Sequence, residues 1–194
     1  MNGGLRAAQA NRTRSRLVAT ARRQFGRSGY DAVSVAALVA SAGVTKGALY
    51  HHFIDKRALF EEVFVQEQRR LLVHTARAVA GVAEPRARLI DGCAAYLGAV
   101  RQTGVRQIVL VDGPAVLGWR AWREADDRMW HRHLAVAVEA AQAAGQLAPG
   151  PADLSARMLS GALAELALAG EADGRRLVAR LLEGLSPRPR RPRA

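Results

Sequence analysis

The sequence predicts an all-α protein in which an N-terminal three-helix domain of the helix-turn-helix type precedes a larger helical body. Two observations favour helices. The 194 residues are 49% hydrophobic and only 5% aromatic, so the core must consist mainly of Ala, Leu and Val, and Ala and Leu favour helices. Apolar residues also recur three and four positions apart in successive segments. A third observation, a glycine-containing turn between two short patterned segments, indicates the helix-turn-helix.

Charge is sorted along the chain. Residues 1–60 contain ten Lys or Arg and two acids, residues 61–186 contain fifteen of each, and residues 187–194 contain four Arg and no acid. A basic first third on a neutral body favours binding to a polyanion. The alternative is charge that serves only solubility, but such charge is rarely sorted so cleanly.

The first 28 residues divide into an arm and a helix. Residues 1–10 lack the apolar run of a signal peptide, and we expect them to form a flexible basic arm. A helix follows, with arginines on one face, and Gly29 ends it. Its apolar stripe consists of Leu17, Val18, Ala21 and Phe25.

Two short helices come next, joined by the turn "SAGV". Ser34 stands where the first needs an N-cap, and Thr45 where the second needs one. Gly43 can adopt the left-handed conformation that a tight turn requires. In a helix-turn-helix the second helix enters the major groove of DNA. We therefore assign residues 11–54 to a DNA-binding domain.

The second of these helices begins with small residues. Gly47 and Ala48 leave little bulk, so the helix backbone can approach the floor of a groove. Lys46 can reach a guanine edge or a phosphate. We expect further contacts, to phosphates, from Thr45, Tyr50 and His51.

The segments "ATARRQFGRSGYDAVSV" and "LVASAGVTKGALYHHFIDKRALF" resemble the N-terminal domain of TetR/AcrR transcriptional regulators. The resemblance covers about residues 15–62 and is most specific around 42–60. Three positions depart from the family pattern: Gln24, Val39 and Ala37. These departures affect packing inside the domain more than the face that would enter the groove. The resemblance implies that DNA-contacting positions of the family are occupied here by Ser34, Thr45, Lys46, Gly47, Ala48, Tyr50, His51 and Lys56.

The body, residues 55–184, is also patterned as helices. Breaks fall at "GVAEP", "DGPAV" and "APGP". We expect helices over about 55–80, 85–103, 119–144, 152–169 and 172–184. Residues 185–194 form a basic Pro/Arg tail whose composition cannot pack as a helix.

By the resemblance, the body holds a small-molecule pocket and the dimer interface. We expect an apolar or aromatic ligand between the 85–103 and 119–144 helices, because all three tryptophans lie within residues 119–130. Each aromatic candidate is as readily an ordinary core residue. The candidates for lining the pocket are Tyr96, Trp119, Trp122, Met129 and Trp130.

The last two helices carry apolar stripes that suit dimerisation. The segment "LSARMLSGALAELAL" has small residues among leucines, and a second stripe follows at 177–182. Two such helices from each of two chains can form a four-helix interface, as in the family; alternatively, the stripes close the core of one chain. A homodimer is expected because two-fold partners match a palindromic site.

The sequence thus predicts a cytoplasmic, ligand-responsive transcriptional regulator that is not an enzyme, most simply a repressor released from a palindromic operator, with an activator left open. The rival is a helical enzyme or small-molecule carrier whose basic region is incidental. We expect no cofactor and no metal, since Cys93 is the single cysteine, no two histidines are four apart, and neither "GxSxG" nor a Gly-rich phosphate loop occurs. No run of 18 apolar residues exists, so no membrane span is expected.

Overall fold

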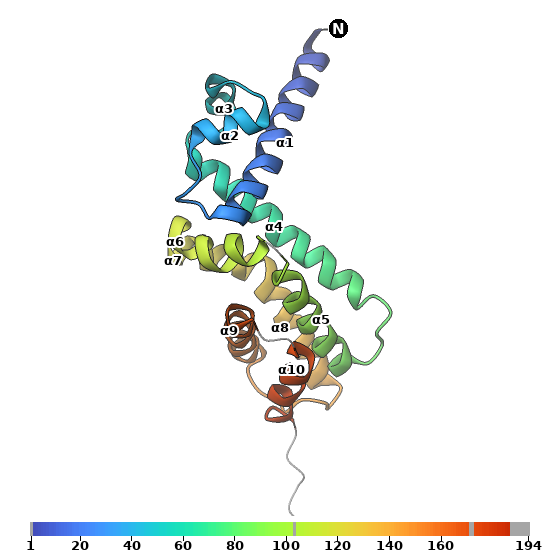
Figure 1. The fold of residues 1–194 in the computed structure, drawn as a ribbon. Helices are drawn as coiled ribbons and strands as arrows, with labels where there is room; N and C mark the ends of the chain where they lie inside the picture. Colours follow the sequence, from blue (N-terminus) through green and yellow to red (C-terminus); the bar gives the residue numbers. More distant parts are fainter. Residues whose placement is uncertain (1, 103, 171–172, 187–194) are drawn as a thin grey trace, which may run out of the picture. The chain divides into compact units, whose positions relative to one another are not determined.

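The computed structural model describes residues 2–102, 104–170 and 173–186, with only the backbone described for 2–6. Within these ranges the ordered elements are helices and no strand occurs, which confirms the all-α prediction (Figure 1). None of the helices in these ranges combines the length and apolar character needed to span a lipid bilayer. The expectation that the tail is unstructured concerns 187–194, which lie outside the described residues.

The chain forms two compact units. The first contains the residues up to Gln68 together with Gln102–Arg123, and the second contains Arg69–Arg101 and the residues from Glu124 onward. The helix α4 (Lys56–Ala78) contributes its first half to one unit and its second half to the other. The middle of the sequence is therefore divided between the units.

In the first unit, α1 (Asn2–Ser28) packs against α2 (Val35–Ala42) and α3 (Lys46–His52), as Figure 1 shows. The rings of Phe25 and Phe60 lie 5.5 Å apart in an edge-to-face contact, and Tyr30 lies 5.2 Å from Phe60. Two arginine–carboxylate pairs also join α1 to α4. They are Arg14 with Glu62 at 2.8 Å and Arg22 with the buried Glu67 at 2.5 Å.

The structure differs from the sequence prediction at the N-terminus. We expected residues 1–10 to be a flexible arm, but α1 already begins at Asn2. The segment "LRAAQA" at 5–10 consists of strong helix formers, so a helix nucleated on the packed stripe around Leu17 extends towards the N-terminus at little cost.

A second difference concerns Pro114. The expected break at "DGPAV" does not occur. The π-helix η1 (Gln107–Asp112) leads directly into the α-helix α6 (Gly113–Leu117). Pro114 has no N–H to donate, and the carbonyl of Val109, five positions earlier in η1, accepts from the Trp122 indole. The helix instead ends at Gly118, which has a φ of +81°.

The second unit contains α5 (Pro85–Val100), η2 (Asp127–His131), α8 (Arg132–Ala143), α9 (Ala152–Ala169) and α10 (Gly174–Glu183). Helix α5 packs against α8, α9 and α10, and α8 packs against α9. The predicted helix over 119–144 is present as α7 (Trp119–Asp126), η2 and α8 in direct succession. The 152–169 helix has the predicted bounds.

Candidate nucleic-acid interface and ligand cavity

Side-chain caps fix both helices of the helix-turn-helix. Ser34 accepts a hydrogen bond from the backbone N–H of Ala37 at 3.1 Å, and Thr45 accepts one from Ala48 at 3.1 Å. Gly43 adopts a left-handed conformation with φ +61° and ψ +43°. Because both ends of the turn are held, the orientation of α3 relative to α2 is well defined.

Helix α3 has one buried and one open side. Leu49 is fully buried and Phe53 is 5% exposed, so both belong to the core of the unit. Lys46, Gly47 and His51 are exposed, Ala48 is half-buried, and Tyr50 is 46% exposed. The candidate DNA-contacting residues of α3 therefore share the open side, with Thr45 exposed at its start.

Nothing inside the protein requires a glycine at position 47. A Cβ built there would meet only the Thr45 hydroxyl, at 3.9 Å, which is ordinary van der Waals contact. Gly47 also has no left-handed φ. Among the described residues, the fold therefore does not need a glycine at this position.

Lys56 differs from the other candidates. Its ammonium donates to the carbonyls of Tyr30 and Val33, both at 3.0 Å, and lies 3.9 Å from the centroid of the Tyr30 ring. This side chain ties the start of α4 to the loop between α1 and α2. At the same helix start, Asp55 accepts from the backbone N–H of Ala58 at 2.6 Å.

Gln24, one of the departures from the family pattern, has a clear contact. Its side-chain amide donates to the Ser41 hydroxyl at 2.7 Å and to the Ala37 carbonyl at 3.4 Å. Gln24 therefore links α1 to α2 by hydrogen bonds, whereas an apolar residue at this position would link them by packing.

Sequence reasoning did not foresee that the segment Gln102–Arg123 belongs to the unit that carries the helix-turn-helix. Arg57 donates to the carbonyls of Val116 and Leu117, at 3.2 and 3.1 Å, at the end of α6. The buried Asp112 accepts from the backbone N–H of Tyr30. These partners lie about 60 and 82 positions apart, so no local pattern could indicate them.

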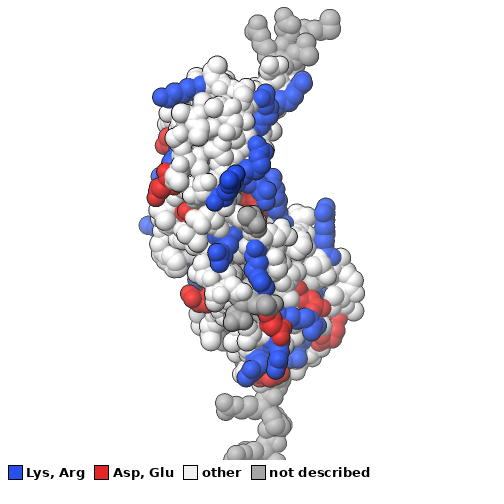
Figure 2. Space-filling model, viewed as in Figure 1, with Lys and Arg blue, Asp and Glu red and all other residues white. Residues whose placement is uncertain are grey.

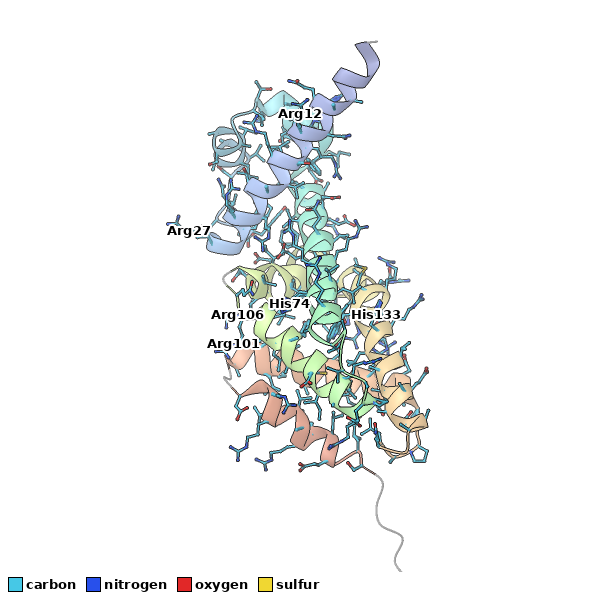
Figure 3. The ribbon with its side chains drawn as sticks, turned by 90° about the vertical axis from the view of Figure 1, so that its right-hand side faces the viewer. Arg12, Arg27, His74, Arg101, Arg106 and His133 are labelled. Atoms are coloured by element: carbon cyan, nitrogen blue, oxygen red, sulfur yellow. The ribbon has the colours of Figure 1, made fainter. Side chains whose placement is uncertain are left out.

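The second unit contains a cavity of about 280 Å³ between its part of α4 and the helices α5 and α8. Its walls are mainly apolar, and His133, which Figure 3 shows extending from α8, lies among the lining residues. Burial raises the pKa of the lining Cys93 thiol to about 12, so this thiol stays protonated and serves as packing surface. Other lining residues are Leu72, Val79, Leu89, Trp130 and Leu134.

The structure does not bring the five pocket candidates together. Trp130 lines the cavity, and the buried Tyr96 stacks on it with ring centroids 4.3 Å apart and planes at 22°. Met129 is half-buried on η2. Trp119 and Trp122 belong to the first unit, where Trp119 is 65% exposed and Trp122 donates from its indole to the Val109 carbonyl at 2.9 Å. Burial also raises the pKa of Tyr96.

Two family models match the sequence. Residues 17–63 match the model for bacterial regulatory proteins of the tetR family. Residues 86–186, more than half of the chain, match the model for the tetracyclin repressor-like C-terminal domain. The chain belongs to the TetR family. The family resemblance of the helix-turn-helix segment is thereby confirmed, and it extends over the body.

Individual TetR-family relatives agree with this assignment. The transcriptional regulator UidR of Escherichia coli strain K12 is 35% identical over 74 residues, which are 38% of this chain and 38% of UidR. The chain thus matches less than two fifths of the length of these curated relatives. A solved TetR-family regulator from Pectobacterium atrosepticum has a TM-score of 0.78 and 30% identity, covering 94% of this chain and 98% of that one.

A third TetR-family comparison concerns the fold alone. The structure of RolR in complex with resorcinol has a TM-score of 0.71 and 17% identity, and the match covers 92% of this chain and 90% of RolR. At this identity, the likeness shows a shared helical architecture. It does not extend the ligand of RolR to this chain.

Proposed function

We propose that this TetR-family protein is a homodimeric transcriptional repressor that binds a palindromic operator and is released by a small apolar or aromatic molecule. The observation that carries the proposal is the open side of α3. It combines a lysine, a glycine without an internal reason and hydrogen-bonding side chains on a helix fixed at both ends. A helix-turn-helix presents its second helix to the major groove in this way.

On α3 we divide the DNA contacts by chemistry. Lys46, at the first position of the helix, is placed to read a base edge, while Tyr50 and His51 contact phosphates. Gly47 and Ala48 admit the helix to the groove. Thr45 and Ser34 serve first as caps, and each hydroxyl keeps a free proton to donate to a phosphate. Lys56 contributes by positioning, because its ammonium is bonded inside the unit.

The charge of the first unit supports DNA as the partner. Helix α1 contains seven arginines and no acid. In Figure 2, blue side chains follow the part of the surface where α1 lies, and Figure 3 shows Arg12 projecting from that helix. Such a field attracts a polyanion before any specific contact forms.

We assign the DNA-binding role to residues 11–54 and the effector-binding and dimerisation roles to residues 55–184. The dimer interface is proposed on α9 and α10. Large apolar side chains are exposed there: Leu154 is 57% exposed, Met158 69%, Leu168 42% and Leu181 44%. A second copy of the same helices would cover this surface.

The effector site is proposed in the cavity lined by Trp130. Residues that line it come from α4, α5, η2 and α8, so a bound molecule can change their packing. From this site the chain runs without interruption through η2 and α7 to Trp122, which is bonded inside the first unit. An effector releases DNA only if it binds one of the two conformations more tightly than the other.

The relatives are named as transcriptional regulators, and we propose that this chain likewise regulates transcription and is not an enzyme. Its place of action would be the cytoplasm, where bacterial DNA lies. The test is the Lys46→Ala variant on operator DNA. A loss of about 1–3 kcal/mol, with relaxed preference at one position of each half-site, supports base reading. An unchanged affinity contradicts the role of α3.

A further inference from the structure

The first turns of α1 extend beyond the packed part of the first unit. Helix α1 begins at Asn2, but Leu17 is the first of its described side chains to be buried. Of residues 7–12 only Ala10 is even half-buried, and the others are exposed. Figure 1 shows this part of α1 continuing past α2 and α3. The segment therefore presents a helical surface that the packing of the unit does not use.

One side of this segment carries hydrogen-bond donors. Four polar residues follow one another at the i, i+3, i+4 and i+7 spacing that places side chains on one face of a helix. We call them the α1 stripe, and they are Gln9, Arg12, Thr13 and Arg16. Thr13 is half-buried and the other three are exposed. Because α1 contains no acid, the stripe is a positively charged surface.

Arg16 places the α1 stripe beside the start of α3. Its guanidinium donates to the Ala42 carbonyl at 2.6 Å and to the Gly43 carbonyl at 3.5 Å. Both carbonyls belong to the turn that precedes Thr45, the N-cap of α3. In a helix-turn-helix the start of the second helix contacts the base edges. The α1 stripe is therefore continuous with the proposed DNA-contacting surface of α3.

Arg12 is the arginine of the stripe that the fold leaves available. It lies one helical turn before Arg16, about 6 Å further along the axis and on the same side. It is exposed and makes no hydrogen bond or ion pair with another described residue. Arg14, on another side of α1, is bonded to Glu62 and lies 5.2 Å from the centroid of the Phe53 ring. The fold thus uses Arg14 and Arg16 internally but not Arg12.

The charge and the place of the α1 stripe indicate its partner. Arginine, glutamine and threonine side chains all donate to phosphate oxygens, and a surface without acids favours a polyanion. The major groove is about 12 Å wide, which one α-helix with its side chains fills. With α3 in the groove, the stripe beside it must face the edge of the groove, where the phosphates lie.

We infer that the N-terminal extension of α1 is a second DNA-contacting element, in which Arg12 binds a backbone phosphate beside the groove that α3 enters. The inference rests on the proposed function, to which it adds a contact outside the helix-turn-helix. The family model matches from residue 17 onward, so Gln9, Arg12 and Thr13 precede the matched segment. This contact is therefore a feature of the chain's own N-terminal sequence.

The test removes the charge of Arg12 and measures how DNA binding depends on salt. Full-length protein is titrated onto DNA from upstream of its own gene and onto random DNA of equal length, between about 50 and 200 mM salt. Each arginine that neutralises a phosphate contributes about 0.9 to the slope of log affinity against log salt. Since a dimer brings two copies, Arg12→Gln should make the slope shallower by about 1.8 and weaken both DNAs by the same factor.

Two variants serve as controls. Arg12→Lys keeps the charge and should keep the slope, because an ammonium also binds a phosphate. Arg27→Gln removes the same charge from an exposed position in the last turn of α1. This position lies about 22 Å from Arg12 along the helix, beyond the range over which exposed charges act in salt, so the slope should not change. All three variants should melt like the wild type.

A slope in Arg12→Gln equal to that of the wild type would overturn the inference. An equal reduction in Arg27→Gln would also overturn it, because the effect would then be one of general charge. A loss confined to the upstream DNA would assign Arg12 to base reading and not to a phosphate. A wild type that binds neither DNA refutes the proposed regulator together with this contact, whereas an unchanged slope in a protein that binds DNA refutes only the contact of α1.

Discussion

The backbone N–H of Tyr30 donates to Oδ2 of Asp112 at 2.8 Å, across 82 positions of sequence. Gln107 donates to the other oxygen of the same carboxylate at 2.9 Å. Asp112 is only 9% exposed, and Tyr30 lies in the loop that leads from α1 to α2. This hydrogen bond therefore joins the end of η1 to the loop between α1 and α2 within the first unit.

Removing this acceptor should destabilise the first unit. In Asp112→Ala the Tyr30 N–H loses its partner in a partly buried site, at a cost of about 1–3 kcal/mol in the free energy of unfolding. Asp112→Asn keeps an acceptor oxygen and should lose less. Urea unfolding followed by circular dichroism measures both. The exposed Asp31, changed to Ala, serves as the control, and a loss as large for Asp31→Ala as for Asp112→Ala would refute the role of the bond.

Gly47→Ala should separate folding from DNA binding. The added Cβ meets only the Thr45 hydroxyl at 3.9 Å, and alanine favours a helix by up to about 1 kcal/mol over glycine. The variant should therefore be at least as stable as the wild type and yet lose at least tenfold in operator affinity, because the methyl group stands between α3 and the groove.

Gly98→Ala is the control for this experiment. Gly98 lies on an exposed part of α5 with no atom within 4 Å of a built Cβ. It should gain a similar stability without any change in operator affinity. If Gly47→Ala binds the operator as well as Gly98→Ala does, α3 does not approach DNA through position 47.

Met158→Glu should disrupt the dimer without unfolding the chain. Met158 is 69% exposed in the single chain, so a charge there is hydrated in the monomer but buried in the proposed interface, which is unfavourable. Light scattering should show a monomer with a wild-type circular dichroism spectrum, and operator affinity should fall because one half-site is read alone. A variant that remains dimeric would place the interface elsewhere.

The contact between η2 and α9 should weaken in acid. Asp153 accepts from His131 at 2.7 Å and from Arg157 at 3.1 Å, and the bond with His131, followed by that with Arg157, lowers the pKa of Asp153. A carboxylate with a lowered folded-state pKa stabilises the protein above its unfolded pKa of about 4, and this contribution is lost as the pH falls through the folded value.

The Asp153→Asn variant should therefore melt at a lower temperature than the wild type at pH 6–7, and the difference should close below about pH 4. Thermal melts over this pH range measure the effect, with the exposed Glu139→Gln as the control. A difference that does not shrink as the pH falls below about 4 would show that the carboxylate charge is not the cause.

Local signals were sufficient to predict much of the fold. Caps and apolar spacing located α2, α3 and α9, because Ser34, Thr45 and the stripe of 154–168 act within a few residues of themselves. The open side of α3 followed from the same spacing, since Leu49 and Phe53 had to face inward. These features depend on short-range geometry, which the sequence contains directly.

Long-range contacts could not be predicted in this way. Three tryptophans within twelve residues suggested one pocket, but Trp122 donates to the Val109 carbonyl in the first unit, whereas Trp130 stacks on Tyr96 in the second. The two rings lie apart because different helices pack against them. The residues next to each tryptophan in the sequence do not indicate which helix that will be. The same holds for Asp112, whose partner Tyr30 belongs to another part of the chain.

We propose above all that α3 reads a specific DNA sequence. The most direct measurement is the affinity of the full chain for DNA upstream of its own gene and for random DNA of equal length, at about 150 mM salt. We expect a protected palindrome, bound at least about a thousandfold more tightly than random DNA, with that preference reduced in Lys46→Ala. Equal affinity for the two DNAs would contradict it.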